Sequence, residues 1–256
     1  MAVASRAQLL ALGGIPVVQP GDDLSAIIAD ALEREGVRLQ AGDVLVVAQK
    51  IVSKAEDRFV ALATVTPSAR ATEIARETGK DPRLVEVILS ESKRVVRTRR
   101  DLIIVEHRLG IVLANAGVDQ SNVGSDAAHR VLLLPRDPDA SARALRDTLA
   151  TRYGCDIAVV VNDSVGRAWR RGTIGIALGA AGLPSLLDLR GQPDMFGRQL
   201  RSSIVGLADE IAATASLMMG QAAEGRPVVL IRGLSLPYED APAQSLIRPE
   251  QEDLFR

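Results

Sequence analysis

Apolar positions along this chain recur with two different spacings, which predict helices and buried strands. In residues 22–35 the apolar side chains fall on one face of a helix, and Asp22 or Asp23 is placed to cap it. Gly79 is a typical helix stop, and Asp81 followed by Pro82 is a typical helix start. The predicted helices are 22–35, 69–78, 82–92, 138–153 and 200–220.

Short apolar runs between the helices predict the strands, at 44–48, 102–106, 110–114, 131–134, 157–161 and 228–232. A short polar turn joins the second and third runs, so a hairpin is expected there. Because strands and helices alternate only loosely around this hairpin, the pattern favours an α+β (mixed α/β) fold with mixed sheets. We expect one domain over residues 1–256, with a division into two lobes left open, and a polar tail at about 237–256.

Composition excludes several classes of function. The apolar fraction of 47% supports a sizeable core, and 31 basic against 32 acidic residues provide no overall field for nucleic acid or a membrane surface. Aromatic residues make up 2% of the chain, too few for base-stacking platforms. Cys155 is the only cysteine, and neither a signal peptide nor a membrane-length apolar run is present. A soluble cytoplasmic protein is expected.

Polar side chains with metal and phosphate chemistry follow the predicted strand 157–161, where we expect the strand to end. Asp163 and Ser164 supply a carboxylate and a hydroxyl, the oxygen ligands that Mg²⁺ and Mn²⁺ prefer. The alternative is an Asx-type turn that caps the next segment. Three arginines follow, and they favour a phosphate or carboxylate site: Arg167, Arg170 and Arg171.

A second acidic segment, 114–122, places Asp119 and Asn122 close together, although a plain polar turn is the alternative. Lys54 is either a solvated lysine or a point charge for phosphate. No P-loop, dinucleotide fingerprint or nucleophile elbow occurs in the chain. His107 and His129 lack metal-ligand spacing and are interpreted as surface residues, so zinc is not expected.

Taken together, these segments resemble the coenzyme F420-0:gamma-glutamyl ligase family in its stand-alone form, without the carboxy-terminal flavin domain of longer relatives. The resemblance covers about residues 14–234. Its pieces are GDVLVVAQKIVSKAE (42–56), GKDPRLVEVILSES (79–92), ANAGVDQSN (114–122), LLLPRDPDASA (132–142), NDSVGRAWRRG (162–172), DLRGQPDMFGRQL (188–200) and ADEIAATASLMMG (208–220).

The resemblance implies a GTP-dependent ligase that joins L-glutamate to the carboxylate of the coenzyme F420 precursor through an acyl phosphate. One or more glutamates are added, with γ-linkages after the first. It also implies Mg²⁺ or Mn²⁺, two ions in all, and an intertwined homodimer. Two alternatives stay open from the residues: a metal-dependent phosphohydrolase, and a non-catalytic nucleotide-binding relative.

Residue roles follow from the same resemblance, position by position. Metal ligands fall at Asp119, Asp163, Ser164 and Gln221. Nucleotide contacts fall at Ile15, Pro16, Val17, Val18, Gln49, Lys50, Lys54, Asn122, Met219, Gly220 and Gln221. Lys54 and one arginine, taken as Arg170, would neutralise charge during phosphoryl transfer.

The chain departs from the family pattern at two places. Gln221 stands where some relatives carry a metal-binding glutamate, and a neutral amide is a weaker ligand for a hard cation. Either the second metal is held more loosely, or Glu224 substitutes for the missing carboxylate. Gln49 and Lys50 stand where some relatives have small hydroxyl residues at a nucleotide contact.

Overall fold

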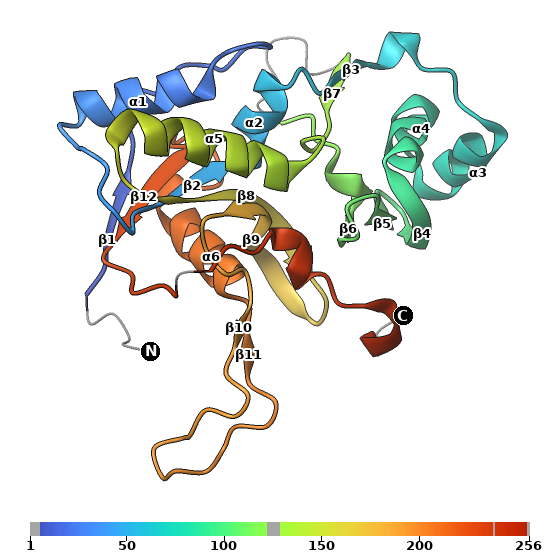
Figure 1. Ribbon diagram of the computed structural model, residues 1–256. Helices are drawn as coiled ribbons and strands as arrows, with labels where there is room; N and C mark the ends of the chain where they lie inside the picture. Colours follow the sequence, from blue (N-terminus) through green and yellow to red (C-terminus); the bar gives the residue numbers. More distant parts are fainter. Residues whose placement is uncertain (1–5, 122–128, 238, 255–256) are drawn as a thin grey trace.

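The computed structural model describes residues 6–121, 129–237 and 239–254, and its centre is a five-stranded sheet (Figure 1). The strand order is β1-β12-β2-β8-β9, in which β2 and β8 are parallel and the other neighbouring pairs are antiparallel. This arrangement confirms the α+β fold with mixed sheets. The strands are β1 (Gln8–Ala11), β2 (Val44–Ala48), β8 (Ala158–Arg167), β9 (Arg170–Ala181) and β12 (Val228–Arg232).

Helices cover both faces of this sheet, which explains why β2 is apolar at every position. One face carries α1 (Leu24–Arg34) and α5 (Pro138–Tyr153), and the other carries α6 (Leu207–Met219) (Figure 1). Successive residues of β2 therefore enter opposite cores: Leu45 and Val47 enter the first, and Val44 and Val46 the second.

The last helix is shorter than its apolar pattern predicts. It begins at Leu207 rather than at Leu200, because the residues before it pair with an earlier segment. The paired strands are β10 (Leu187–Asp188) and β11 (Ile204–Val205). Together with the loop between them they form an arm, residues 186–206, that projects away from the body of the molecule (Figure 1).

Residues 59–121 and 129–132 form a second body beside the sheet, which we call the insert lobe; the remaining described residues are the main lobe (Figure 1). The helix stop at Gly79, the cap at Asp81 and the hairpin over 102–114 are confirmed. A strand before this hairpin was not predicted. The elements are β3 (Phe59–Ala61), α3 (Ala69–Thr78), α4 (Pro82–Ser90), β4 (Ser92–Arg99), β5 (Leu102–His107), β6 (Val112–Ala114) and β7 (Arg130–Leu132).

Part of the polar tail is anchored to the main lobe. The Asp139 carboxylate, at the start of α5, accepts hydrogen bonds from the backbone N–H groups of Ala243 and Gln244 at 2.7 and 3.2 Å. Ala243 is buried against α6 and the sheet. Within the described residues, none of the helices is long and apolar enough to cross a membrane.

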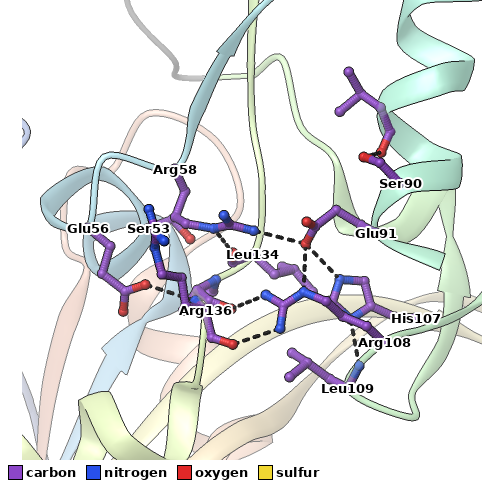
Figure 2. A network of polar contacts seen from close by, with 12 residues as sticks. Ser53, Glu56, Arg58, Ser90, Glu91, His107, Arg108, Leu109, Leu134 and Arg136 are labelled. Carbon is purple, nitrogen blue, oxygen red and sulfur yellow. Dashed lines mark hydrogen bonds and ion pairs between the residues drawn. The ribbon is translucent and has the colours of Figure 1, made fainter. Parts of the chain in front are cut away.

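A buried ionic network centred on Glu91 lies where the chain passes between the lobes (Figure 2). Glu91 Oε2 accepts from Arg58 Nη2 at 2.9 Å and from Arg108 Nε at 3.0 Å, and His107 Nε2 lies 3.5 Å away. His107 Nδ1 accepts from the backbone N–H of Leu109 at 3.0 Å, so the proton of the neutral ring is on Nε2 and faces Glu91.

The two histidines differ in exposure, although both were expected at the surface. His129 is exposed, as predicted, but the interpretation of His107 as a surface residue is wrong because its side chain is fully buried. The strand β5 ends inside the lobe junction, where the ring fills space beside Glu91. A histidine within a polar sequence can therefore still be a core residue when a buried carboxylate lies beside its ring.

Opposing effects set the ionisation of Glu91. Burial by itself would raise the pKa of this carboxyl, but hydrogen bonds from His107 and Arg108 and the charges of Arg58 and Arg108 lower the pKa to about 2. Since the ordinary value is 4.5, the ionised form stabilises the folded state by about 3 kcal/mol. This contribution is complete above pH 4.5 and is lost as the pH falls toward 2.

Glu91→Gln is expected to lower the free energy of unfolding by about 3 kcal/mol at pH 7, because it removes the charge that two arginines surround. The difference between variant and wild type should shrink as the pH falls from 5 to 3. Urea titrations at several pH values measure it, with Glu73→Gln in an exposed ion pair as the control. A difference that does not change with pH would contradict the role of the ionised form.

Candidate active site

Strand register brings four distant segments to one edge of the central sheet. Ala48, the last residue of β2, is paired with Asn162 of the parallel strand β8. Val47 is paired with Val228 at the start of β12, and Val229 is paired with Ala11 at the end of β1. The residues that follow β1 and β2, those that precede β12, and Asp163 therefore meet at this edge, the usual place for a ligand site in such sheets.

Asp163 and Ser164 lie within a strand, which corrects the expectation that the strand ends before them. β8 continues to Arg167 and pairs with β9 over its whole length, with a bulge between Val161 and Asn162. Bulges often re-aim side chains next to active sites. The strand continues through its pairing with β9. The glycine-rich sequence of β9 lets α6 approach closely, since a Cβ at Gly175 would clash with Ser216 Oγ.

Alternation along β8 sends Asp163 and Ser164 to opposite faces of the hairpin. Asn162 lies on the α6 face, where its Nδ2 donates to Ser216 Oγ at 3.0 Å and contacts Met219 Sδ at 3.4 Å. Ser164 shares this face, and Asp163 lies on the face of α2 (Gln49–Ala55). The carboxylate and the hydroxyl are therefore placed to serve two different cation positions.

Asp119 and Asp163 come from different lobes, and a first cation would be held by these two carboxylates. Asp119 accepts from Lys50 Nζ at 2.7 Å, and from the backbone N–H and hydroxyl of Ser121 at 2.6 and 3.0 Å. Burial alone would raise the pKa of Asp119, but these donors hold it below its ordinary value. The sequence segment 114–122 was identified as a site, but the role of Ser121 in it was missed.

The pKa of Asp163 is shifted in the opposite direction from that of Asp119. Burial, reinforced by the neighbouring Asp119 carboxylate, raises the pKa of Asp163 to about 6, although the N–H of Ser164, Lys50 and Gln49 favour the charged form. Two carboxylates that disfavour each other's charge in a partly buried place are stabilised by a cation between them. The oxygen donors fit a hard divalent ion such as Mg²⁺ or Mn²⁺.

Basic residues gather beside the carboxylate pair. Lys54 is on α2, which is not among the predicted helices, and only 8% of its surface is exposed. Burial lowers the pKa of Lys54, and the charges of Lys50 and Arg130 lower it further. Arg130 stacks on the ring of Phe59, with its guanidinium carbon 4.4 Å from the ring centroid. Like charges held together in this way favour an anion such as phosphate.

A cation on the Ser164 side of β8 would have weaker ligands. Met219 ends α6, and Gly220 and the exposed Gln221 follow it on the Ser164 side of β8. Glu224 folds back over Gly220 and accepts from the backbone N–H of Ala222 at 2.8 Å. In the part of the chain that the structure describes, no group of three or more His, Cys, Asp or Glu side chains is placed to hold a metal. A cation here would depend on ligand oxygens.

The amino-terminal segment lies beside α2. Ile15, Pro16, Val17 and Val18 follow β1. Val18 is buried in the same core as Val52 of α2, and Gly21 donates its N–H to the carbonyl of Ala55 at 2.9 Å. The expected nucleotide segment therefore reaches the helix that carries Gln49, Lys50 and Lys54.

Arg170 lies away from the carboxylates and lysines described above. It pairs with Arg167 at the tip of the β8–β9 hairpin, roughly 13 Å beyond Asp163 at about 3.3 Å per residue. Trp169 at the same tip is 91% exposed. Asn122, the remaining expected nucleotide contact, lies outside the described residues.

Comparison with known proteins identifies the family of this chain. The family model described as F420-0:Gamma-glutamyl ligase matches residues 14–233. Proteins named Coenzyme F420:L-glutamate ligase are similar along almost their whole length. The one from Methanothermobacter thermautotrophicus is 45% identical, covering 97% of this chain and 98% of the relative. The one from Methanocaldococcus jannaschii is 40% identical, covering 94% of each. This chain belongs to the F420-0:gamma-glutamyl ligase family of enzymes.

Proposed function

We propose that this enzyme uses GTP to form an amide between the amine of L-glutamate and the carboxylate of the coenzyme F420 precursor. The observation that carries the proposal is the pair Asp119 and Asp163, which come from two lobes, are near enough for the charge of Asp119 to raise the pKa of Asp163, and have Lys50 and Lys54 beside them. Carboxylates for cations and lysines for phosphate are the groups that phosphoryl transfer requires. The names of the relatives support the substrates.

The reaction proceeds in two steps. The γ-phosphoryl group moves from GTP to an oxygen of the precursor carboxylate, so the bond between this phosphorus and the β-phosphate oxygen breaks, a new P–O bond forms, and GDP leaves. The glutamate amine then attacks the acyl carbon, phosphate leaves with the electron pair of the C–O bond, and the amine proton passes to solvent. Lys54 holds phosphate oxygens in position, and its burial limits attack by water on the acyl phosphate.

Two divalent cations, Mg²⁺ or Mn²⁺, would neutralise charge on the transferred phosphoryl group when bound. Asp119 and Asp163 would hold the first of them. Ser164 and Gln221 would hold the second, with nucleotide oxygens completing both ligand shells. The neutral ligands of the second position make it the weaker one.

We also propose that the enzyme is a homodimer. Met195 and Phe196, at the end of the arm, are 95% and 93% exposed, and such side chains on a projecting segment are typical of an interface. Interlocked arms would make the dimer intertwined, and the partner's hairpin could bring its arginine to the site that Arg170 cannot reach within one chain. Analytical ultracentrifugation of the wild type and of Phe196→Ser tests this, and a wild type that sediments as a monomer would contradict it.

Asp163→Asn is expected to lower glutamate addition at least 100-fold without unfolding the protein, because it removes one of the two carboxylates of the first cation position. Mass spectrometry of the deazaflavin product, with GTP, Mn²⁺ and glutamate present or singly omitted, measures it. Asp101→Asn in an exposed turn is the matched control. Phosphate release without an amide product would favour a phosphohydrolase instead, and GTP binding without turnover would favour a non-catalytic relative.

Gln221→Glu should lower the Mn²⁺ concentration that gives half-maximal activity by about tenfold, because a carboxylate binds a hard cation more tightly than an amide does. Metal titrations of the wild type and the variant at saturating GTP provide the measurement. Gln221→Asn keeps the amide and serves as the control. If the titration is unchanged in Gln221→Glu, Gln221 is not at a cation position.

A further inference from the structure

The two carboxylates of the first cation position belong to different lobes, so their separation depends on how the lobes are held together. Asp163 is on β8 of the central sheet. Asp119 follows Val118, which packs in the insert-lobe core, and its backbone pairs with Leu132 of β7. A small rotation of the insert lobe would therefore move Asp119 relative to Asp163.

The chain connects the lobes twice, and the two connections run side by side. The first, residues 55–59, leaves α2, and the second, residues 132–138, enters α5. Arg58 joins them: its Nε donates to the carbonyl of Leu134 at 2.9 Å, and its own carbonyl accepts from the N–H of Leu133 at 3.1 Å. Both connections are thus fixed to each other at one place.

Glu91 links the insert lobe to the point where Arg58 joins the two connections. It follows α4, and its Oε2 accepts from Arg58 of the first connection at 2.9 Å. It also accepts from Arg108, whose other guanidinium nitrogens donate to the carbonyls of Arg136 and Pro135 in the second connection at 2.7 and 3.0 Å (Figure 2). One carboxylate therefore links α4, the end of β5 and both connections.

The position of this network excludes direct chemistry. Glu91 is 9% exposed and His107 is fully buried, so neither side chain is accessible to a nucleotide. On the α2 side, Glu56 continues the network by accepting from the N–H of Arg136 at 2.8 Å and from Ser141 Oγ at 2.6 Å. The orientation of α2, which carries Lys50 and Lys54, is thereby coupled to the same junction.

We propose that Glu91 is a positioning residue, which fixes the insert lobe so that Asp119 stands opposite Asp163 at the distance a divalent cation requires. The inference rests on the proposed cation site. A purely structural role for the network is the alternative, and it predicts that every variant that lowers stability equally has the same effect on function.

The test compares two junction variants with a control that lowers stability elsewhere in the insert lobe. Glu91→Gln removes the central charge. Arg108→Lys keeps a positive charge but removes the paired guanidinium hydrogen bonds to the carbonyls of Arg136 and Pro135. The control is a substitution at Ile103, which is fully buried in the insert-lobe core. Ile103→Val is used first, and Ile103→Ala replaces it if a larger loss of Tm is needed to match that of the junction variants. The Mn²⁺ dissociation constant is measured by electron paramagnetic resonance at a temperature where circular dichroism shows all proteins folded.

Both junction variants should bind Mn²⁺ at least tenfold more weakly than the wild type, whereas the control should stay within twofold. Arg108→Lys keeps the proposal testable if Glu91→Gln does not fold. Equal weakening in the control, or unchanged affinity in the junction variants, would overturn the positioning role and leave the proposed function standing. If the wild type itself binds no Mn²⁺, the proposed cation site fails, and the positioning role fails with it.

Discussion

The parallel pairing of β2 with β8 is the constraint on which the rest of the molecule depends. Parallel strands place their carboxyl ends at the same edge, and here Ala48 stands beside Asn162. The helix α2, which carries Lys50 and Lys54, must therefore begin next to the strand position that carries Asp163. An antiparallel pair would have sent these groups to opposite ends of the sheet. The site exists because this one pairing is fixed by two hydrophobic cores, one on each face.

The electrostatic balance of the site follows from this placement. Asp119 is compensated by Lys50 and Ser121, and the pKa of Asp119 is low, whereas the less compensated Asp163 has a raised pKa of about 6. Lys54 shows the converse, because burial and neighbouring cations lower the pKa of its ammonium. An acidic pair that favours cations therefore lies beside a basic group that favours anions. A metal–nucleotide complex carries both kinds of charge and can satisfy both sides at once.

The local sequence pattern was sufficient to predict those helix ends and turns whose signals lie within a few residues of one another. The caps at Asp23 and Asp81, the stop at Gly79 and the hairpin over 102–114 all depend on neighbouring residues. The strand β4, with the sequence SKRVVRTR, was missed because only one side of it is covered and its bulges interrupt the alternation. The start of α6 was misplaced because pairing with β10, far from it in sequence, determines where the helix begins.

The sequence by itself determined the chemistry of this protein: which oxygens and cations are available, which motifs occur, and hence the family. Only the tertiary structure decided their distances. It brought Asp119 to Asp163 and left Arg170 at a hairpin tip, because strand register and lobe packing act between residues far apart in the chain. It also revealed Glu91 as the centre of the lobe junction, which no local pattern marks, since its partners, Arg58 and the adjacent His107 and Arg108, come from two segments distant from it in the sequence. Such long-range contacts depend on the whole fold rather than on neighbouring residues.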